Sequence, residues 1–312
     1  MELKLNNKAR SFINMSNFMK LFAVLFRFLI VVAICYIILF PLITKVASSF
    51  MSRTDIWDQT VNLIPRNPTL VNYTLAFEYM DFTTAFLNSF ILAFVVSLFQ
   101  LLSCTLIGYG FASFDFKGKN FWFFLVIFSL VIPPELIITP LYLNFRFFNF
   151  LGLMPGDGIN LIGTNWPFIL LAATGTGYKN GLFIYIMRQF FKGMPKGLAE
   201  AAYVDGAGPF RTFFKIMLPG AVPGMVIVFL FSFVWQWNDY FLTTMFVGQR
   251  NILPLALEEL PRAVLGDQYL HLPEEASLLI NTGSLMIILP LVLLYIFLQK
   301  YFVESVQRSG IK

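Results

Sequence analysis

Positions 82–114 read FTTAFLNSFILAFVVSLFQLLSCTLIGYGFASF, a stretch without a single Asp, Glu, Lys or Arg. A bilayer core about 30 Å thick needs roughly 20 helical residues to cross it, so this stretch is long enough to span a membrane. Its apolar residues run continuously and do not alternate, which argues against a strand of a membrane barrel. An open strand is excluded as well, because its unpaired backbone groups would find no water in lipid. The stretch therefore predicts a transmembrane helix.

The composition of the whole chain agrees with a membrane protein. Of its 312 residues, 58% are hydrophobic and only 12% are charged, whereas a soluble domain carries roughly 25% charged residues. So little charge cannot cover a water-facing surface, which excludes a disordered chain, a coiled coil and a disulfide scaffold. Cys35 and Cys104 fall inside apolar segments and are interpreted as small buried hydrophobic residues. The net charge of +5 is explained by basic cytoplasmic loops, so no nucleic-acid partner is expected.

Six apolar segments are long enough to cross a bilayer, so the expected fold is an all-α integral membrane protein with six transmembrane helices. The predicted spans cover about 28–44, 86–112, 121–143, 159–187, 216–246 and 276–299. The first segment follows a basic tail and could instead belong to a cleavable signal peptide. An uncleaved helix is preferred, because the apolar run is too long and no small-x-small cleavage site follows before Lys45.

Lysine and arginine sort to alternate sides of these spans. The tails 1–27 and 300–312, the segment around Lys117 and the loop 188–215 together hold 15 basic residues against 5 acidic ones. The intervening segments hold 6 basic residues against 10 acidic ones. The positive-inside rule therefore predicts that both termini and the loop 188–215 are cytoplasmic.

Five of the six predicted spans contain residues that disrupt a regular helix. Examples from the third to the sixth span are Pro133, Pro134, Pro140, Pro167, Gly175, Gly177, Pro223, Gly224 and Pro290. Freed backbone groups are not tolerated against lipid, so such positions face neighbouring helices or a water-lined cavity. Kinks that help a bundle to pack explain any one of them, but this number of breaks is more typical of a transporter than of an anchor.

Acidic, amide and aromatic residues inside the spans are candidates for a translocation path. They are Glu135, Trp166, Trp235, Trp237, Asn238, Asp239 and Tyr240. An acid in hydrocarbon costs at least about 2.5–3.5 kcal/mol, so it usually faces a pathway or a partner. Aromatic faces beside amide and carboxylate groups suit sugars, whose C–H faces are apolar and whose hydroxyls need hydrogen-bond partners. A position near the headgroups and an interfacial aromatic belt remain alternative explanations.

The loop 188–215 carries the most specific pattern in the chain. Pro195 suits the first position of a helix, which Glu200, Ala201 and Ala202 continue with good propensity. Gly206 can adopt the left-handed conformation that ends it. Such a helix is thin enough for close approach to another protein. An ordinary helical hairpin between two spans would show the same sequence pattern.

This segment resembles the signature loop of permease subunits in binding-protein-dependent ABC importers. The shared pattern is Glu-Ala-Ala, three residues, Gly, nine residues and Ile-x-Leu-Pro, here at positions 200–219. Several flanking stretches resemble the second permease of maltose-type carbohydrate importers, namely 188–195, 205–207, 237–241, 253–257 and 299–303. The resemblance covers about Asn88 to the C-terminus. Departures are Gly197 and Ala199 before the motif, and an expanded helix break at 174–181.

The resemblance implies a type I ABC importer permease fold and a set of partners. In that family two permeases form the path, two ATPase subunits bind beneath them, and an extracytoplasmic solute-binding protein delivers the sugar. The residues implied in ATPase coupling are Glu200, Ala201, Ala202, Asp205, Gly206, Ala207, Leu218 and Pro219. The partner permease is expected to be a different chain, and the acidic segment 250–275 to touch the binding protein.

The chain itself is expected to be neither an ATPase nor a metalloprotein. It lacks the G-x-x-x-x-G-K-[ST] phosphate loop, since Gly118-Lys119 is followed by Asn120. ATP and Mg²⁺ are therefore expected on the partner ATPases, with no cofactor in this chain. Its single histidine, His271, offers no metal-ligating group of residues. The expected location is a bacterial-type plasma membrane that the chain crosses several times.

Three other functions remain open at this level. A secondary transporter would show repeated halves and an intramembrane ion relay, which are not evident. A membrane scaffold without transport activity would leave the signature loop unexplained. An ABC importer permease for a non-sugar solute shares that loop, so the substrate class rests on the flanking motifs alone.

Overall fold

The computed structural model describes residues 15–310 except 154, 155, 157 and 249. Positions 1–14 of the predicted N-terminal tail and positions 311–312 of the predicted C-terminal tail lie outside the described residues. The described residues form helices and no strands, with one isolated antiparallel bridge between Phe148 and Ile159. An all-α fold is thereby confirmed for the described part of the chain.

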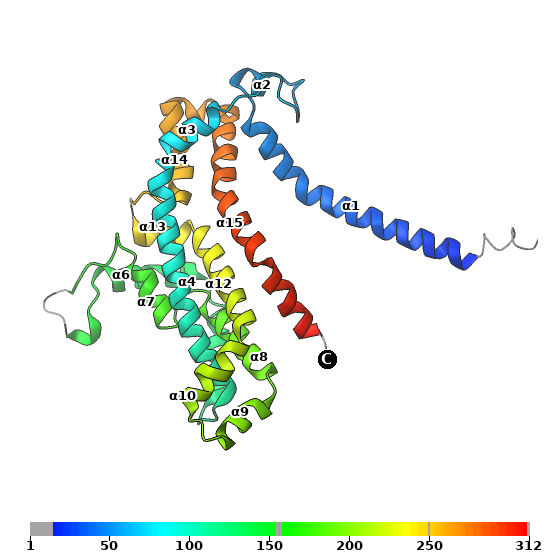
Figure 1. The fold of residues 1–312 in the computed structure, drawn as a ribbon. Coiled ribbons are helices and arrows are strands. Elements are labelled where there is room, and N and C mark those ends of the chain that lie inside the picture. Colours follow the sequence, from blue (N-terminus) through cyan, green and yellow to red (C-terminus); the bar gives the residue numbers. More distant parts are fainter. Residues whose placement is uncertain (1–14, 154–155, 157, 249, 311–312) are drawn as a thin grey trace, which may run out of the picture.

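The helices follow one another in this order (Figure 1). They are α1 (Met15–Ser49), α2 (Arg53–Trp57), α3 (Val71–Tyr79), α4 (Phe82–Ser113), α5 (Lys119–Phe128), α6 (Pro134–Arg146), η2 (Phe150–Gly152), α7 (Trp166–Ala173), α8 (Asn180–Gly193), α9 (Lys196–Val204), α10 (Pro209–Thr212), the π-helical turn η3 (Phe213–Met217), α11 (Leu218–Gly220), α12 (Val222–Trp237), α13 (Phe241–Val247), α14 (Leu253–Leu265), η4 (Gly266–Leu270) and α15 (Pro273–Gly310).

Three of the described helices are long and apolar enough to cross a membrane alone, and a fourth span results if one bent pair is counted. The three lie in α1, α4 and α15, and α15 continues into the predicted C-terminal tail. The bent pair joins Pro209–Gly220 to Val222–Trp237 at an angle of 72°. The other predicted spans correspond to segments that the structure divides into shorter helices. The predicted count of six spans therefore stays a prediction.

The predicted spans 121–143 and 159–187 are each broken into two shorter helices. The first consists of α5 with 10 residues and α6 with 13, and the second of α7 with 8 and α8 with 14. A proline disfavours helical geometry at the preceding residue, so no helix runs through Pro133-Pro134: α5 ends at Phe128 and α6 begins at Pro134. Gly175 has φ = +72°, which fits the end of α7 within the expanded break expected at 174–181.

Helix α4 forms the centre of the bundle, packing against α7, α8 and α12 (Figure 1). Its contact with α8 is close because Gly108 has no side chain. A Cβ built at Gly108 would lie 2.7 Å from Met187 Cβ and 2.9 Å from the Arg188 backbone nitrogen. Both distances are too short for real atoms, so the α4–α8 spacing depends on this glycine.

We predict that Gly108→Ala destabilises the protein by about 1–3 kcal/mol, because the added methyl overpacks the α4–α8 contact. Gly110 is the matched control, since a Cβ there meets nothing within 4 Å. Gly110→Ala is expected to be neutral or to stabilise by up to about 1 kcal/mol through helix propensity. Thermal unfolding in detergent distinguishes the two variants, and equal melting temperatures would contradict the packing argument.

Helix α1 lies apart from the bundle along most of its length (Figure 1). Its most apolar stretch has no buried residues, and it meets α15 near its C-terminal end. There Lys45 Nζ donates to Asn281 Oδ1 at 2.7 Å, and Asn281 Nδ2 donates to Ser48 Oγ at 3.0 Å. The ion pair of Arg53 with Glu275, at 3.1 Å, extends the same junction.

Candidate functional site

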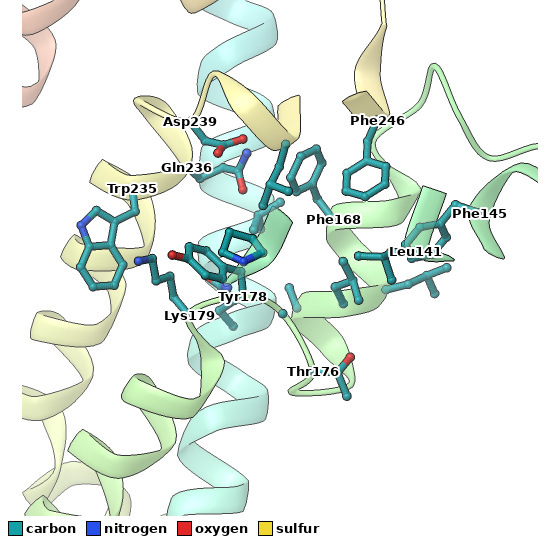
Figure 2. Close-up of a pocket in the computed structure, with 18 of the residues that line it drawn as sticks. Leu141, Phe145, Phe168, Thr176, Tyr178, Lys179, Trp235, Gln236, Asp239 and Phe246 are labelled. Atoms are coloured by element: carbon teal, nitrogen blue, oxygen red, sulfur yellow. The ribbon is translucent and has the colours of Figure 1, made fainter. Parts of the chain in front are cut away.

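A cavity of about 850 Å³ lies where the broken helices meet (Figure 2). Its wall comes from α4, α6, α7 and α8, from α12 and α13, and from the connections 174–179 and 238–240. Of the helix breakers named from the sequence, Pro134 and Gly177 line this space. Backbone groups freed at such interruptions need a polar or protein-covered surrounding, which this space provides.

A buried hydrogen-bond network borders the cavity and joins four helices. Gln100 Nε2 of α4 donates to Asn180 Oδ1 of α8 at 2.6 Å, and the Ser232 hydroxyl of α12 donates to Gln100 Oε1. Asn180 Nδ2 also donates to the Ala172 carbonyl of α7 at 3.3 Å. An unpaired buried polar group costs about 1–3 kcal/mol, so this network fixes the relative positions of its helices. The sequence analysis missed it, because its residues are distant along the chain.

Lys179 presents a cation at the cavity wall. Its Nζ lies 4.1 Å from the centre of the Tyr178 ring and 4.7 Å from that of the Trp235 ring. Figure 2 shows the ammonium group beside both aromatic side chains. Cation–π contacts of this kind are worth about 0.5–2 kcal/mol and offset part of the cost of a charge at membrane depth.

The acidic and aromatic residues at the end of α12 are held by local hydrogen bonds. Asp239 Oδ2 accepts from the backbone nitrogen and the hydroxyl of Thr243, both at 2.7 Å. The Tyr240 hydroxyl donates to the carboxylate of Glu258 in α14. Asn238 Nδ2 donates to the Val234 carbonyl at 2.8 Å. Asp239, Tyr240 and Asn238 all line the cavity.

Not every predicted path residue reaches the cavity. Trp235, Asn238, Asp239 and Tyr240 line it, whereas Glu135, Trp166 and Trp237 do not. Glu135 is exposed in the first turn of α6, and Trp166 is exposed at the start of α7. Trp237 is 1% exposed, and its Nε1 donates to the Ile287 carbonyl of α15 at 3.3 Å. Trp237 therefore contributes to the packing of α12 against α15.

The signature loop forms a helix, a glycine turn and a second helix. Helix α9 ends at Val204, and the Asp205 nitrogen donates to the Ala201 carbonyl at 2.9 Å. Gly206 has φ = +78°, and the Ala207 nitrogen donates to the Ala202 carbonyl at 2.9 Å. This 6→1 hydrogen bond closes a Schellman-type helix end, the left-handed role expected for Gly206. Further along, Leu218 is half-buried and Pro219 is exposed in α11.

The helix α9 presents two faces of different character. Ala202 is buried, so the small side chain packs against the chain itself. Glu200 is exposed, and Val204 and Phe210 are 87% and 79% exposed. Large apolar side chains gathered on one loop are typical of a surface that binds another protein. The sequence analysis did not single out Val204 or Phe210.

A mainly helical membrane protein, whose broken helices surround a cavity and whose loop exposes an apolar surface, has the architecture of a transport subunit. Residues 104–308 match the family described as "binding-protein-dependent transport system inner membrane component". The chain belongs to this family of ABC transporter permeases, which are membrane components and not enzymes.

Individual relatives agree with this assignment over most of the chain. The arabinooligosaccharides transport system permease protein AraQ of Halalkalibacterium halodurans is 31% identical over 284 residues, 89% of this chain and 93% of that protein. The galactooligosaccharides transport system permease protein GanQ of Bacillus subtilis is 27% identical over 293 residues, 92% of this chain and 95% of that protein. Both similarities extend beyond the signature loop to nearly the full length.

A solved structure shows the same fold. The similar chain belongs to the crystal structure of a bacterial ABC transporter involved in the import of the acidic polysaccharide alginate. It superposes with a TM-score of 0.72 at 20% identity and covers 91% of this chain and 97% of its own. The permease fold expected from the sequence is thereby confirmed.

Proposed function

We propose that this chain forms half of the membrane path of an ATP-driven importer of an oligosaccharide or a related sugar. The observation that carries the substrate class is one stretch of the cavity wall, where aromatic side chains lie beside hydrogen-bonding groups. Trp235 and Tyr240 offer flat apolar faces, and Gln236, Asn238 and Asp239 offer donors and acceptors beside them. The names of the relatives AraQ and GanQ, which refer to oligosaccharides, support the same class.

The proposed topology has six spans with both termini in the cytoplasm. In this arrangement α5 with α6 and α7 with α8 each form one broken span around the cavity. The structure supports it by placing α9 and α10 at one end of the bundle and α2, α3 and α14 at the other (Figure 1). The basic loop 188–215 and the acidic segment 250–275 then face opposite sides, as the charge distribution requires.

Coupling is assigned to the loop that contains Glu200. We infer that Glu200, Val204 and Phe210 insert into a cleft of one ATPase subunit, with Gly206 forming the turn between them. Closure of the ATPases on ATP would move this loop as a rigid body and tilt the spans attached to it. A second permease, a second ATPase and an extracytoplasmic solute-binding protein complete the assembly. The segment 250–275 is the proposed contact for the binding protein.

The proposal is tested by uptake into vesicles that carry the assembled transporter in their membrane. ATP is enclosed inside the vesicles, and the binding protein is added outside. Arabino- and galacto-oligosaccharides are the first substrates to try. Uptake is expected to stop without ATP and to be insensitive to an ionophore, whereas a secondary transporter would show the opposite behaviour. Trp235→Ala is expected to lower uptake about 10-fold or more, because we expect a sugar face to stack on the indole, and stacking of a nucleic-acid base on an aromatic ring is worth roughly 1–3 kcal/mol. Assembly with the ATPases should stay intact.

A further inference from the structure

A second, smaller pocket lies between the start of α5 and the end of α8, outside the cavity described above. It has a volume of about 410 Å³, and its lining includes Lys119, Arg188, Lys192 and Asp115. We call it the cation pocket. Three cations against one carboxylate give it a net positive charge, and neither the proposed path nor the coupling contact uses it.

The cations of this pocket are largely unneutralised. Among the charged side chains that line the pocket, the described residues show one ion pair, between Lys119 Nζ and Asp115 at 3.0 Å. The same Nζ donates to the Phe114 carbonyl at 2.7 Å. Arg188 Nε is buried and has no hydrogen-bond partner among the described residues. A buried donor without a partner costs about 1–3 kcal/mol, so a bound acceptor would relieve this cost.

The arrangement holds the positive charges close together. The Arg188 guanidinium lies 3.9 Å above the Phe123 ring, which fixes it at the pocket. Desolvation lowers the pKa of Lys192, and the charges of Arg188 and Lys119 lower it further. A bound anion would remove this mutual repulsion. Helix α5, ten residues long, also begins at Lys119, so its free N–H groups add a partial positive charge at this end.

The surroundings of the pocket are those of a membrane interface. Phe121 and Trp122 in the first turn of α5 are exposed, as is Phe124 one turn further on. Exposed aromatic residues next to cations are typical of the headgroup level of a bilayer, where Trp residues are enriched. In the proposed orientation this level belongs to the cytoplasmic leaflet, whose anionic lipids attract Lys and Arg.

We propose that the cation pocket binds a phosphate group, with Arg188, Lys192 and Lys119 as its ligands. The chemistry fits the phosphodiester of an anionic lipid headgroup, whose acyl chains would lie along the exposed aromatic face of α5. It also fits free inorganic phosphate from the cytoplasm. Guanidinium and ammonium groups bind phosphate oxygens through charge-assisted hydrogen bonds, roughly twice as strong as neutral ones. Only the lipid source depends on the topology proposed above.

The test measures the melting temperature of the delipidated, assembled transporter in a neutral detergent. Phosphatidylglycerol, phosphatidylcholine, oleate and inorganic phosphate are titrated separately. We expect phosphatidylglycerol to raise the melting temperature at lower concentration than phosphatidylcholine or oleate. Lys192→Gln should require about fivefold more phosphatidylglycerol for the half-maximal shift, as expected for one cation near an anionic surface. The Arg188→Gln/Lys192→Gln double variant should require more still.

Lys117→Gln is the matched control. Lys117 is an exposed cation in the connection between α4 and α5, next to the pocket, and does not line it. It should respond like the unmodified protein. A shift produced by inorganic phosphate alone and lost in Lys192→Gln would identify soluble phosphate as the ligand. Equal responses of Lys192→Gln and Lys117→Gln, or equal shifts from oleate and phosphatidylglycerol, would overturn the proposal. Since no substrate is present, failure here is distinct from failure of sugar uptake.

Discussion

Transport by a Glu200→Lys variant is expected to fall about 100-fold or more, while the protein still inserts into the membrane. Glu200 is exposed on α9, so its replacement leaves the internal packing of the chain unchanged. We expect Glu200 to pair with a cation of the ATPase cleft; truncating one partner of such a buried charge pair costs about 2–5 kcal/mol, and a reversed charge adds repulsion. We therefore expect the ATPase subunits to dissociate from this permease. Co-purification and ATP-dependent uptake measure the two effects separately.

Two further variants make this result specific. Glu200→Gln keeps the size of the side chain and should weaken ATPase binding less than the lysine does. Glu78→Gln removes an exposed carboxylate from α3, at the opposite end of the bundle, and should leave uptake unchanged. Normal uptake and normal ATPase co-purification by Glu200→Lys would contradict the assignment of this loop to coupling.

Hydropathy alone was sufficient to predict the long, uninterrupted helices. The charge-free stretch 82–114 corresponds closely to α4, which ends at Ser113. The helix breaks were visible as Pro133-Pro134 and as Gly175 with Gly177, but their geometry was not. A proline shows that a helix cannot continue regularly, whereas the direction of the next helix is set by its tertiary packing, as for α8 and α12, which both pack against α4. The 72° bend before α12 is a result of this kind.

The residues of the buried network beside the cavity could not be predicted from the sequence either. Gln100, Asn180 and Ser232 come from three different helices, and each looks like an ordinary polar residue in its own segment. Only the tertiary fold brings them together. The motif at 200–206, in contrast, was recognisable because all its residues lie within two turns of one helix and its glycine end. Local patterns are therefore predictable from sequence where long-range networks are not.

Trp235 and Trp237 show that the sequence does not reveal which face of a single helix meets the cavity. Two helical residues correspond to a rotation of roughly 200°, so these side chains must point to nearly opposite faces of α12. The sequence cannot tell which face meets the cavity, and both were candidates for the path. The structure places Trp235 at the cavity wall and Trp237 in the core between α12, α4 and α15.

Replacing Trp237 by Ala is accordingly expected to destabilise the protein by about 3–5 kcal/mol, the usual cost of deleting a large aromatic from a packed core. Its ring lies 5.6 Å from those of Phe86 and Phe233, so both would border the resulting void. The Ile287 carbonyl would also lose the indole donor, which lies at 3.3 Å. Thermal unfolding in detergent and the yield of folded protein are the measurements.

The neighbouring tryptophan provides the control on the same helix. Trp235→Ala should change the melting temperature far less, because Trp235 is only half-buried at the cavity wall. Trp237→Phe should recover most of the lost stability, since it refills the void and leaves only the Ile287 carbonyl without its partner, at about 1–3 kcal/mol. If Trp237→Ala instead melted normally and transported poorly, Trp237 would belong to the path, and the separation of the two faces of α12 would be wrong.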